Sequence, residues 1–428
     1  MDTIFALATA QGKAGVAVVR ISGPRAFDVC EQLSGTVPVP RAATLRTLKD
    51  QSGDFIDQAL LIGFKAPSSF TGEDVVELHL HGSIAIVRAI LRILGDFEGL
   101  RLAEPGEFTR RALENGQLDI ARVEGLADLI ESETEAQRKQ ALRSLSGDLG
   151  KKAQIWRTDL IRAAALLEAT IDFADEDVPV DVSPEVSELL DRTLITLKSE
   201  ASGVAVAERI RSGFVVAIVG APNVGKSTLL NALAGRDAAI TSEIAGTTRD
   251  VIEVQMDIKG LPVTVLDTAG VRDTDDVVET LGIEKAIQKA SDSDITVFLT
   301  DTGDLPNKFE TRPHDFILKS KGDLTSDPSA ISGKTGQGVD MLISNIYDYL
   351  IEQSQNVGVA TRERHRIALD RAADNLSVAQ GILALGPDQY EICSEEIRSG
   401  IRALDSLIGH VDVESILDEI FSSFCLGK

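Results

Sequence analysis

A phosphate-binding signature at residues 220–227 constrains the fold of this 428-residue chain more than any other feature. The segment reads GAPNVGKS, directly after the apolar run FVVAIV and directly before the helix-favouring TLLNALAG. It matches the pattern G-x-x-x-x-G-K-[ST] in the strand, loop and helix order that this pattern requires. The glycines let consecutive backbone N–H groups turn toward a phosphate at the start of a helix. The chain is therefore predicted to contain an α/β P-loop domain.

Two later segments complete a predicted nucleoside triphosphate site. Lys226 would place a positive charge on the β and γ phosphate oxygens, and Ser227 would offer its hydroxyl to Mg²⁺. GTTRD at 246–250 predicts a switch loop in which Thr248 reaches Mg²⁺. DTAG at 267–270 follows the strand-like LPVTVL, which fits an acidic residue on the metal side of the site. The order and spacing of the three segments are typical of a nucleotide hydrolase.

Guanine selection needs a carboxylate that accepts hydrogen bonds from N1 and N2 of the base, and two segments offer one. NKFE at 307–310 has no strand before it and ends in glutamate, whereas SKGD at 320–323 follows the strand-like DFILK and leads into SAISGKTGQG. We therefore predict that the Asp323 carboxylate recognises the guanine base, and we call this residue the base reader. Ser320 departs from the usual asparagine, so nucleotide affinity is expected to be modest. The residues assigned to the GTP site are Asn223, Val224, Gly225, Lys226, Ser227, Thr228, Ser242, Glu243, Ile244, Ala245, Gly246, Thr247, Thr248, Asp267, Thr268, Ala269, Gly270, Lys321 and Asp323.

The residue after DTAG is Val271, where small Ras-type GTPases have a glutamine that orients the attacking water. Valine cannot do this, and Glu279 is the best nearby carboxylate for the role. The alternative is that Glu279 is a solvated residue at a helix start. An arginine finger is also missing, and Asn223 within the phosphate loop could hold a monovalent cation in its place.

Charge and composition limit the binding partners and the cellular location that can be expected for the chain. The formal charge of −24 opposes binding to phosphate backbones over the surface as a whole. A local basic run at 362–371 could meet RNA, but a solvated helix face is the favoured interpretation. No stretch approaches about 18 uninterrupted apolar residues, so no membrane association is expected and the cytoplasm is the predicted location. The cysteines Cys30, Cys393 and Cys425 suggest neither a disulfide framework nor a zinc site.

The apolar periodicity, which changes along the sequence, predicts a multidomain α+β protein. Residues 1–115 alternate short apolar runs with turns, with helices expected near 26–33 and 84–94. Long helical periodicity covers 116–212 and returns over 353–428, on either side of a strand and helix alternation at 213–352. We therefore predict a small N-terminal α/β domain, a helical bundle, and a Ras-like P-loop G domain inserted in that bundle.

The chain as a whole resembles the MnmE family of tRNA-modification GTPases, also called TrmE. The resemblance is carried by GVAVVRISG, SFTGEDVVELHLHG, EPGEFTRRALENGQLD, GAPNVGKS, SEIAGTTRD, DTAGVR and the C-terminal FSSFCLGK. It implies a homodimer that forms through the N-terminal domain, residues 1–115, which would be similar to tetrahydrofolate-binding modules. It also implies a heterotetramer with the flavoprotein MnmG that adds an aminomethyl or carboxymethylaminomethyl group to C5 of the wobble uridine of certain tRNAs. The one-carbon unit would come from 5-formyl- or methylene-tetrahydrofolate.

The resemblance also implies roles for particular residues. Glu279 matches the carboxylate that orients water, and Ser227 and Thr248 match the Mg²⁺ ligands. Many members have lysine where this chain has Gln117, so one charge that could pair with the folate is absent. The positions matching K⁺ ligands are Asn223, Ser242, Ile244 and Thr247. The positions matching folate ligands are Arg20, Glu77, Gln117 and Lys428.

Several residues keep a second interpretation. Arg20 and Glu77 could instead form a structural salt bridge. His79 and His81 share the H-x-H spacing of a metal site, but no third ligand is evident and a structural role is favoured. Cys425 could act in the modification chemistry, with Lys428 lowering its pKa, or could anchor a buried tail.

The leading rival function is a ribosome-assembly GTPase switch of the Era or Der kind. It would share every G-domain motif, but it has no use for Cys425 or a folate-like N-terminal domain. A G domain coupled to ion transport is excluded by the lack of membrane segments.

Overall fold

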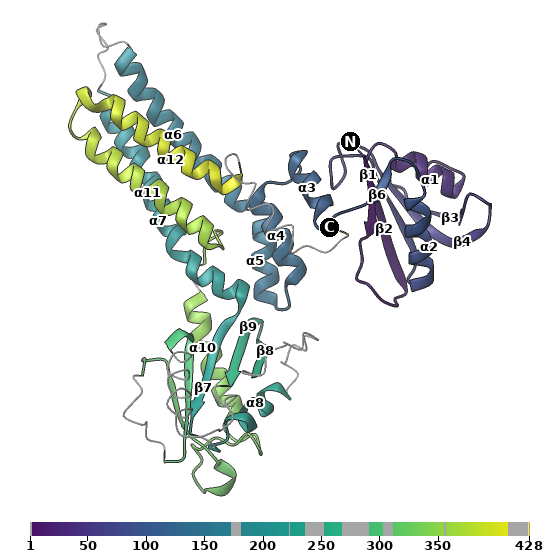
Figure 1. Ribbon diagram of the computed structural model, residues 1–428. Helices are drawn as coiled ribbons and strands as arrows, with labels where there is room; N and C mark the ends of the chain where they lie inside the picture. Colours follow the sequence, from purple (N-terminus) through teal and green to yellow (C-terminus); the bar gives the residue numbers. More distant parts are fainter. Residues whose placement is uncertain are drawn as a thin grey trace, which may run out of the picture. The chain divides into compact units, whose positions relative to one another are not determined.

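The computed structural model shows two compact units, Met1–Ala127 with Asp405–Lys428 and Asp128–Leu404 (Figure 1). The predicted domain limits of 1–115, 116–212 with 353–428, and 213–352 stay predictions. The structure describes residues 2–172, 181–221, 223–235, 252–267, 291–302, 311–354, 357–409 and 427.

A six-stranded sheet forms the core of the first unit, in the order β3-β4-β5-β2-β1-β6. Neighbouring strands pair antiparallel except β1 and β6, which pair in parallel. The strands are β1 (Thr3–Leu7), β2 (Val16–Ser22), β3 (Thr44–Lys49), β4 (Phe55–Phe64), β5 (Val75–His81) and β6 (Leu100–Leu102).

Two helices cover one face of this sheet, α1 (Ala26–Ser34) and α2 (Ile84–Gly95). Both helices were predicted from the sequence and are confirmed. Side chains alternate across a strand, so Val19 and Ile21 of β2 enter the core that α1 and α2 cover. Arg20, between them, points to the opposite face. Two further helices follow, α3 (Glu107–Glu114) and α4 (Ile120–Glu131).

Long helices make the predicted bundle, which is confirmed. Figure 1 shows α6, α7, α11 and α12 running side by side, and α11 packs along α7 more extensively than any other described helix pair. The indole N–H of Trp156 on α6 donates to the Thr196 hydroxyl on α7 at 2.9 Å. The helices are α5 (Glu135–Leu145), α6 (Asp148–Asp172), α7 (Ser183–Ser212), α11 (Glu363–Leu383) and α12 (Tyr390–Ile408).

A five-stranded sheet carries the predicted P-loop domain, in the order β11-β10-β7-β9-β8. Its strands are parallel except β8, which forms an antiparallel hairpin with β9. The tip of that hairpin meets α5 of the bundle, where the Ala136 N–H donates to the Gly260 carbonyl at 2.9 Å. The elements are β7 (Phe214–Gly220), α8 (Lys226–Ala234), β8 (Ile252–Ile258), β9 (Leu261–Asp267), β10 (Ile295–Thr300), β11 (Phe316–Lys319) and α10 (Val339–Gln353).

A buried carboxylate fixes the chain where it returns from the P-loop domain to the bundle. Glu200 of α7 is 3% exposed and accepts hydrogen bonds from the backbone N–H groups of Val359 and Ala360. Lys152 of α6 pairs with the same carboxylate. A Cβ atom at Gly358 would overlap the carboxylate, so glycine allows this close approach. The returning segment is therefore held by the bundle itself.

Among the helices of the described residues, none has the length and apolar character to cross a membrane.

Candidate functional site

The phosphate loop has the backbone shape that its sequence predicts. Asn223 and Gly225 adopt left-handed backbone conformations, with φ of 60° and 109°. A Cβ atom at Gly220 would overlap the Leu299 carbonyl oxygen of β10, so β7 can end this close to its neighbour only with glycine. No side chain caps the first turn of α8, which leaves that end of the helix suited to an anion.

Lys226 lies over this loop. It is 6% exposed, and its ammonium donates to the carbonyl oxygens of Gly220 at 2.6 Å and Ala221 at 2.9 Å. Burial lowers the pKa of Lys226, and the Asp267 carboxylate opposes that change. The positive charge is thus fixed beside the loop that would hold the phosphates.

Ser227 and Asp267 meet although 40 residues separate them in the sequence. The Ser227 hydroxyl on α8 donates to the Asp267 carboxylate at the end of β9 at 2.9 Å. Both ends reach one edge of the sheet because β7 and β9 run in parallel. A hydroxyl and a carboxylate are oxygen donors of the kind that Mg²⁺ prefers, so this pair fits the predicted metal position.

The loop that carries Asp323 packs against the loop at 329–338. The Ser332 hydroxyl donates to the Asp323 carboxylate at 3.0 Å, and the Gly322 N–H donates to the Ile331 carbonyl at 3.0 Å. Gly333 in turn lies against the α8 backbone, where an added Cβ would stand 2.5 Å from the Thr228 carbonyl oxygen. The predicted base reader is therefore linked through packed backbone to the helix that starts at the phosphate loop.

Several predicted residues lie outside the described residues. They include the rejected NKFE segment at 307–310 and Val271. The others are Ser242, Glu243, Ile244, Ala245, Gly246, Thr247, Thr248, Thr268, Ala269, Gly270, Glu279, Cys425 and Lys428.

In the first unit, Arg20 and Glu77 form an ion pair across β2 and β5. The Arg20 Nε and Nη2 atoms lie 3.0 and 2.9 Å from the same Glu77 oxygen, and the side chains are 19% and 17% exposed. The Arg20 guanidinium also lies 5.1 Å from the Phe70 ring centroid and 5.7 Å from that of Phe108. The pair expected under the salt-bridge interpretation is thus present, and it remains partly open to solvent.

Gln117 lies beside the loop that carries Phe70. An added Cβ at Gly72 would stand 3.3 Å from the Gln117 side chain. The Gln117 carbonyl accepts a hydrogen bond from Arg122 at 2.9 Å. Phe70 and Phe108 escaped the sequence analysis, although both belong to the segments SFTGE and GEFTRR that carry the resemblance.

His79 and His81 have different acidic partners. His79 lies 3.4 Å from Glu77, and the His81 Nδ1 atom lies 2.8 Å from the Asp57 carboxylate. In the described part of the chain, no group of three His, Cys, Asp or Glu residues could hold a metal ion. The structural role of the two histidines stays a prediction.

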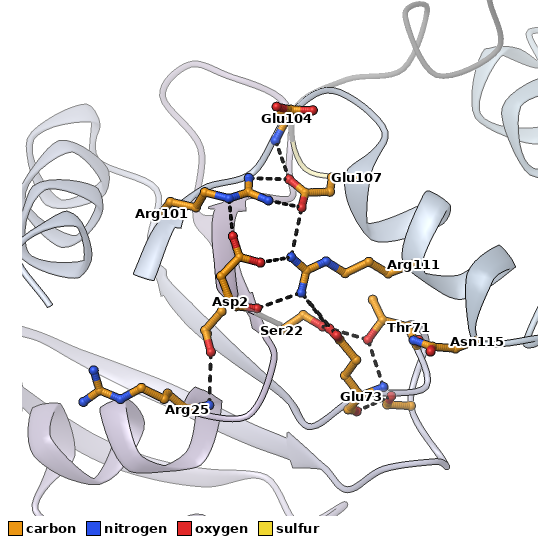
Figure 2. Close-up of polar contacts among 12 residues, drawn as sticks. Asp2, Ser22, Arg25, Thr71, Glu73, Arg101, Glu104, Glu107, Arg111 and Asn115 are labelled. Carbon is orange, nitrogen blue, oxygen red and sulfur yellow. Dashed lines mark hydrogen bonds and ion pairs between the residues drawn. The ribbon is translucent and has the colours of Figure 1, made fainter. Parts of the chain in front are cut away.

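Figure 2 shows an ion network centred on Arg111. Its guanidinium contacts Asp2 at 2.8 Å, Glu107 at 2.9 Å and Glu73 at 3.1 Å. Burial raises the pKa of Glu107, but hydrogen bonds from Arg101 and Arg111 outweigh it, so the net pKa lies below its usual range. The network joins α3 to the N-terminus and to the loop after residue 68, which also carries Phe70.

The basic run on α11 is largely neutralised. Arg366 pairs with Glu363 and with Asp370, the latter at 2.8 Å, and Arg362 pairs with Asp128 at 2.6 Å. These ion pairs reduce the positive charge that the run can offer to RNA, and His365 of the run is buried.

Comparison with known proteins covers the whole chain. The family model described as GTP-binding protein TrmE N-terminus matches residues 3–117, and that of the MnmE helical domain matches residues 120–425. The tRNA modification GTPase MnmE of Roseobacter denitrificans is 59% identical over 429 residues and covers 100% of both chains. MnmE of Ruegeria pomeroyi is also 59% identical with the same coverage. Among solved structures, Aquifex aeolicus Era bound to GDP and AlF4⁻ is 28% identical, covers 32% of this chain and 56% of its own, and has a TM-score of 0.24.

Proposed function

Because this chain belongs to the MnmE family of tRNA modification GTPases, we propose that its phosphate loop binds GTP with Mg²⁺ and that its N-terminal domain holds a folate. The chain is a GTPase that acts in tRNA modification. The rival function, a ribosome-assembly switch, is set aside because the full-length relatives are tRNA modification GTPases.

One observation supports the GTP and Mg²⁺ site most strongly: Ser227 and Asp267 meet at 2.9 Å beside the buried Lys226. Lys226 would neutralise charge on the phosphates, and Ser227 with Thr248 would hold Mg²⁺. Mg²⁺ held there would supply positive charge that stabilises the negative charge developing on the phosphates. Asp323 would select guanine by accepting hydrogen bonds from N1 and N2 of the base.

Substitution at Asp323 tests the base reader. Asp323→Asn replaces a carboxylate acceptor with an amide, so GTP affinity should fall and xanthine nucleotides should bind better. Equilibrium titration with fluorescent GDP and XDP measures both effects. Normal GTP binding by Asp323→Asn, together with its loss in Glu310→Ala, would assign guanine recognition to the other segment.

We propose that potassium replaces the missing arginine finger. Asn223 lies inside the phosphate loop in a left-handed conformation, and Ser242, Ile244 and Thr247 would complete the ion's ligands. Exchange of KCl for NaCl at equal ionic strength should reduce turnover by about 10³-fold, the scale of a supplied finger. Equal rates in the two salts contradict this proposal.

Glu279 is proposed as the residue that orients the attacking water. Glu279→Ala should reduce GTP hydrolysis while nucleotide affinity stays close to wild type, because the carboxylate acts on the water and not on the nucleotide. A matched loss of affinity and turnover would indicate a structural residue instead.

The folate site is proposed at Arg20, Glu77, Gln117 and Lys428. Arg20 and Glu77 fit such a ligand because they are partly open and lie beside two aromatic rings. Arg20 can pair with a ligand carboxylate, and Glu77 can accept N–H groups of a pterin ring. The folate would supply the one-carbon unit.

Titration with 5-formyl-tetrahydrofolate by calorimetry tests this site. Glu77→Gln should weaken binding, whereas Gln117→Lys should strengthen it by restoring a positive charge. Unchanged folate affinity in both variants would contradict a folate site beside Glu77 and Gln117.

A homodimer is proposed through the sheet face that α1 and α2 leave uncovered. Leu45 and Leu60 are paired neighbours on that face and are 55% and 36% exposed, and Val16 on the same face is 56% exposed. Leu60→Asp should shift the full chain toward monomer in sedimentation, whereas an unchanged dimer would place the interface elsewhere.

MnmG and tRNA are the proposed partners, and Cys425 is proposed to act in the modification and not in GTP hydrolysis. Cys425→Ser keeps the size of the side chain and removes the thiolate. Wobble-uridine modification should be lost in cells that rely on this variant, with GTPase rate and melting temperature unchanged. Normal wobble-uridine modification in this variant would contradict the chemical role of Cys425 and favour the alternative, a residue that anchors a buried tail.

A further inference from the structure

We propose that Asp301 is a positioning residue for guanine recognition, because it holds Ser320 and Lys321 in the conformation that presents Asp323 to the base. This inference rests on the proposed role of Asp323. Asp301 directly follows β10, and residues 320 and 321 directly follow β11. The two strands are parallel neighbours with Thr300 opposite Lys319, so their carboxyl ends meet at one edge of the sheet.

Asp301 contacts both residues through a single carboxylate oxygen. Its Oδ1 atom lies 3.0 Å from the Lys321 ammonium and accepts a hydrogen bond from the Ser320 hydroxyl at 3.3 Å. The Ser320 N–H donates to the Thr300 carbonyl at 2.8 Å, which fixes the start of the loop to β10. The pKa of Asp301 lies below its usual range, chiefly because of the hydrogen bond from Lys321. The carboxylate is therefore ionised at neutral pH.

The loop needs such a restraint. Lys321 has a φ of 56° and a ψ of 42°, a left-handed conformation that a residue with a Cβ atom rarely adopts. Such a conformation persists only where surrounding contacts hold it. Asp323 is two residues further on, so a change at Lys321 would redirect its carboxylate.

Serine at position 320 gives Asp301 this role. A serine hydroxyl is one donor on a short side chain, whereas the asparagine usual at this position carries two donors and a carbonyl oxygen. Ser320 is 4% exposed, and its hydroxyl points to Asp301. The Asp301 carboxylate therefore supplies a contact to the loop that the short Ser320 side chain cannot make by itself.

If the ion pair instead held Lys321 away from the nucleotide, its removal would raise nucleotide affinity, which is the opposite result. The side chains of Asp301 and Lys321 are 60% and 42% exposed, so the pair is solvent-screened and the effect is modest. We expect a loss of roughly 3- to 10-fold in nucleotide affinity when Asp301 is removed.

The experiment measures dissociation constants of the full chain for GDP and for IDP, which lacks the 2-amino group that a base-reading carboxylate contacts. Asp301→Ala should weaken GDP binding roughly 3- to 10-fold and lower the preference for GDP over IDP. Asp301→Asn, which keeps an acceptor for Ser320, should fall between wild type and Asp301→Ala. Asp348→Asn, at an exposed position on α10, is the matched control and should leave both constants unchanged.

A double-substitution cycle and a stability measurement complete the test. Ser320→Ala and Asp301→Ala should be less than additive on GDP affinity, because they remove one hydrogen bond. Unchanged or tighter GDP binding in Asp301→Ala overturns the inference, and so does a lower affinity with an unchanged preference for GDP over IDP. Asp323→Asn, measured in parallel, separates the two proposals: normal GDP binding by that variant means that the base reader itself is wrong.

Discussion

Replacing Glu200 by alanine is expected to destabilise the helical bundle without affecting the nucleotide site. The carboxylate is 3% exposed and is the acceptor for two backbone N–H groups, those of Val359 and Ala360. A buried donor left without an acceptor costs about 1–3 kcal/mol, and Glu200→Ala leaves two such donors. We therefore expect a loss of about 2–6 kcal/mol in the free energy of unfolding of the bundle.

The chain carries a built-in reporter for this measurement. Its single tryptophan, Trp156, is buried between α6 and α7, so its fluorescence follows the unfolding of the bundle alone. For a unit of this size, each kcal/mol moves the melting temperature by about 2–4 °C, which gives a decrease of roughly 4–24 °C for Glu200→Ala. Glu200→Gln keeps an oxygen acceptor and should lose less, about 1–2 kcal/mol.

Lys152→Met is the matched control. The lysine side chain is 45% exposed, and both N–H groups keep their acceptor when it is removed, so Lys152→Met should lose less stability than Glu200→Ala. Fluorescent GDP should bind all three variants as it binds the wild type. A Trp156 transition in Glu200→Ala within about 2 °C of the wild-type transition would refute the reasoning, because the two N–H groups would then have found other acceptors.

Glu107 has a net pKa below its usual range, so its contribution to stability should be complete above about pH 4.5 and be lost as the pH falls further. The hydrogen-exchange rates of β1 and β2 in the wild type and in Glu107→Gln should therefore become equal in acid. Gly333→Ala should weaken GDP binding at least about 10-fold in a fluorescence titration, because the new methyl group meets the α8 backbone and must displace the loop at 329–338. Burial raises the pKa of both Cys30 and Cys393 to about 11, so neither should react with a thiol reagent at pH 8 in the native chain. More than one reactive thiol per native chain, that is, any thiol beyond that of Cys425, contradicts this prediction.

The sequence predicts most of the nucleotide site because its parts are local motifs on regular elements. GAPNVGKS forms its loop from neighbouring residues, and parallel strands bring the Ser227 and Asp267 ends to one edge without any further information. The SKGD segment is likewise placed by the strand before it, β11. Motif order and strand direction are enough for these contacts.

The contacts that escaped prediction join residues far apart in the chain. Phe70 and Phe108 reach Arg20 from a loop and from α3, and the side chain of Asp301 meets Ser320 only because β10 and β11 are neighbours. A pattern within one segment carries no information on such meetings, since they depend on how the elements pack. Sequence reasoning did anticipate that Arg20 and Glu77 pair, because each charged residue interrupts an otherwise apolar strand.

The packing of α11 along α7 has a consequence for synthesis of the chain. About 150 residues lie between Ser212, where α7 ends, and Glu363, where α11 begins. At about 5–20 residues per second, a ribosome needs roughly 8–30 s to make that stretch. During this time α7 has not yet met α11, the helix against which it packs most extensively among the described helices. A nascent chain therefore carries an unfinished bundle, open to chaperones and proteases, until the inserted domain has left the ribosome.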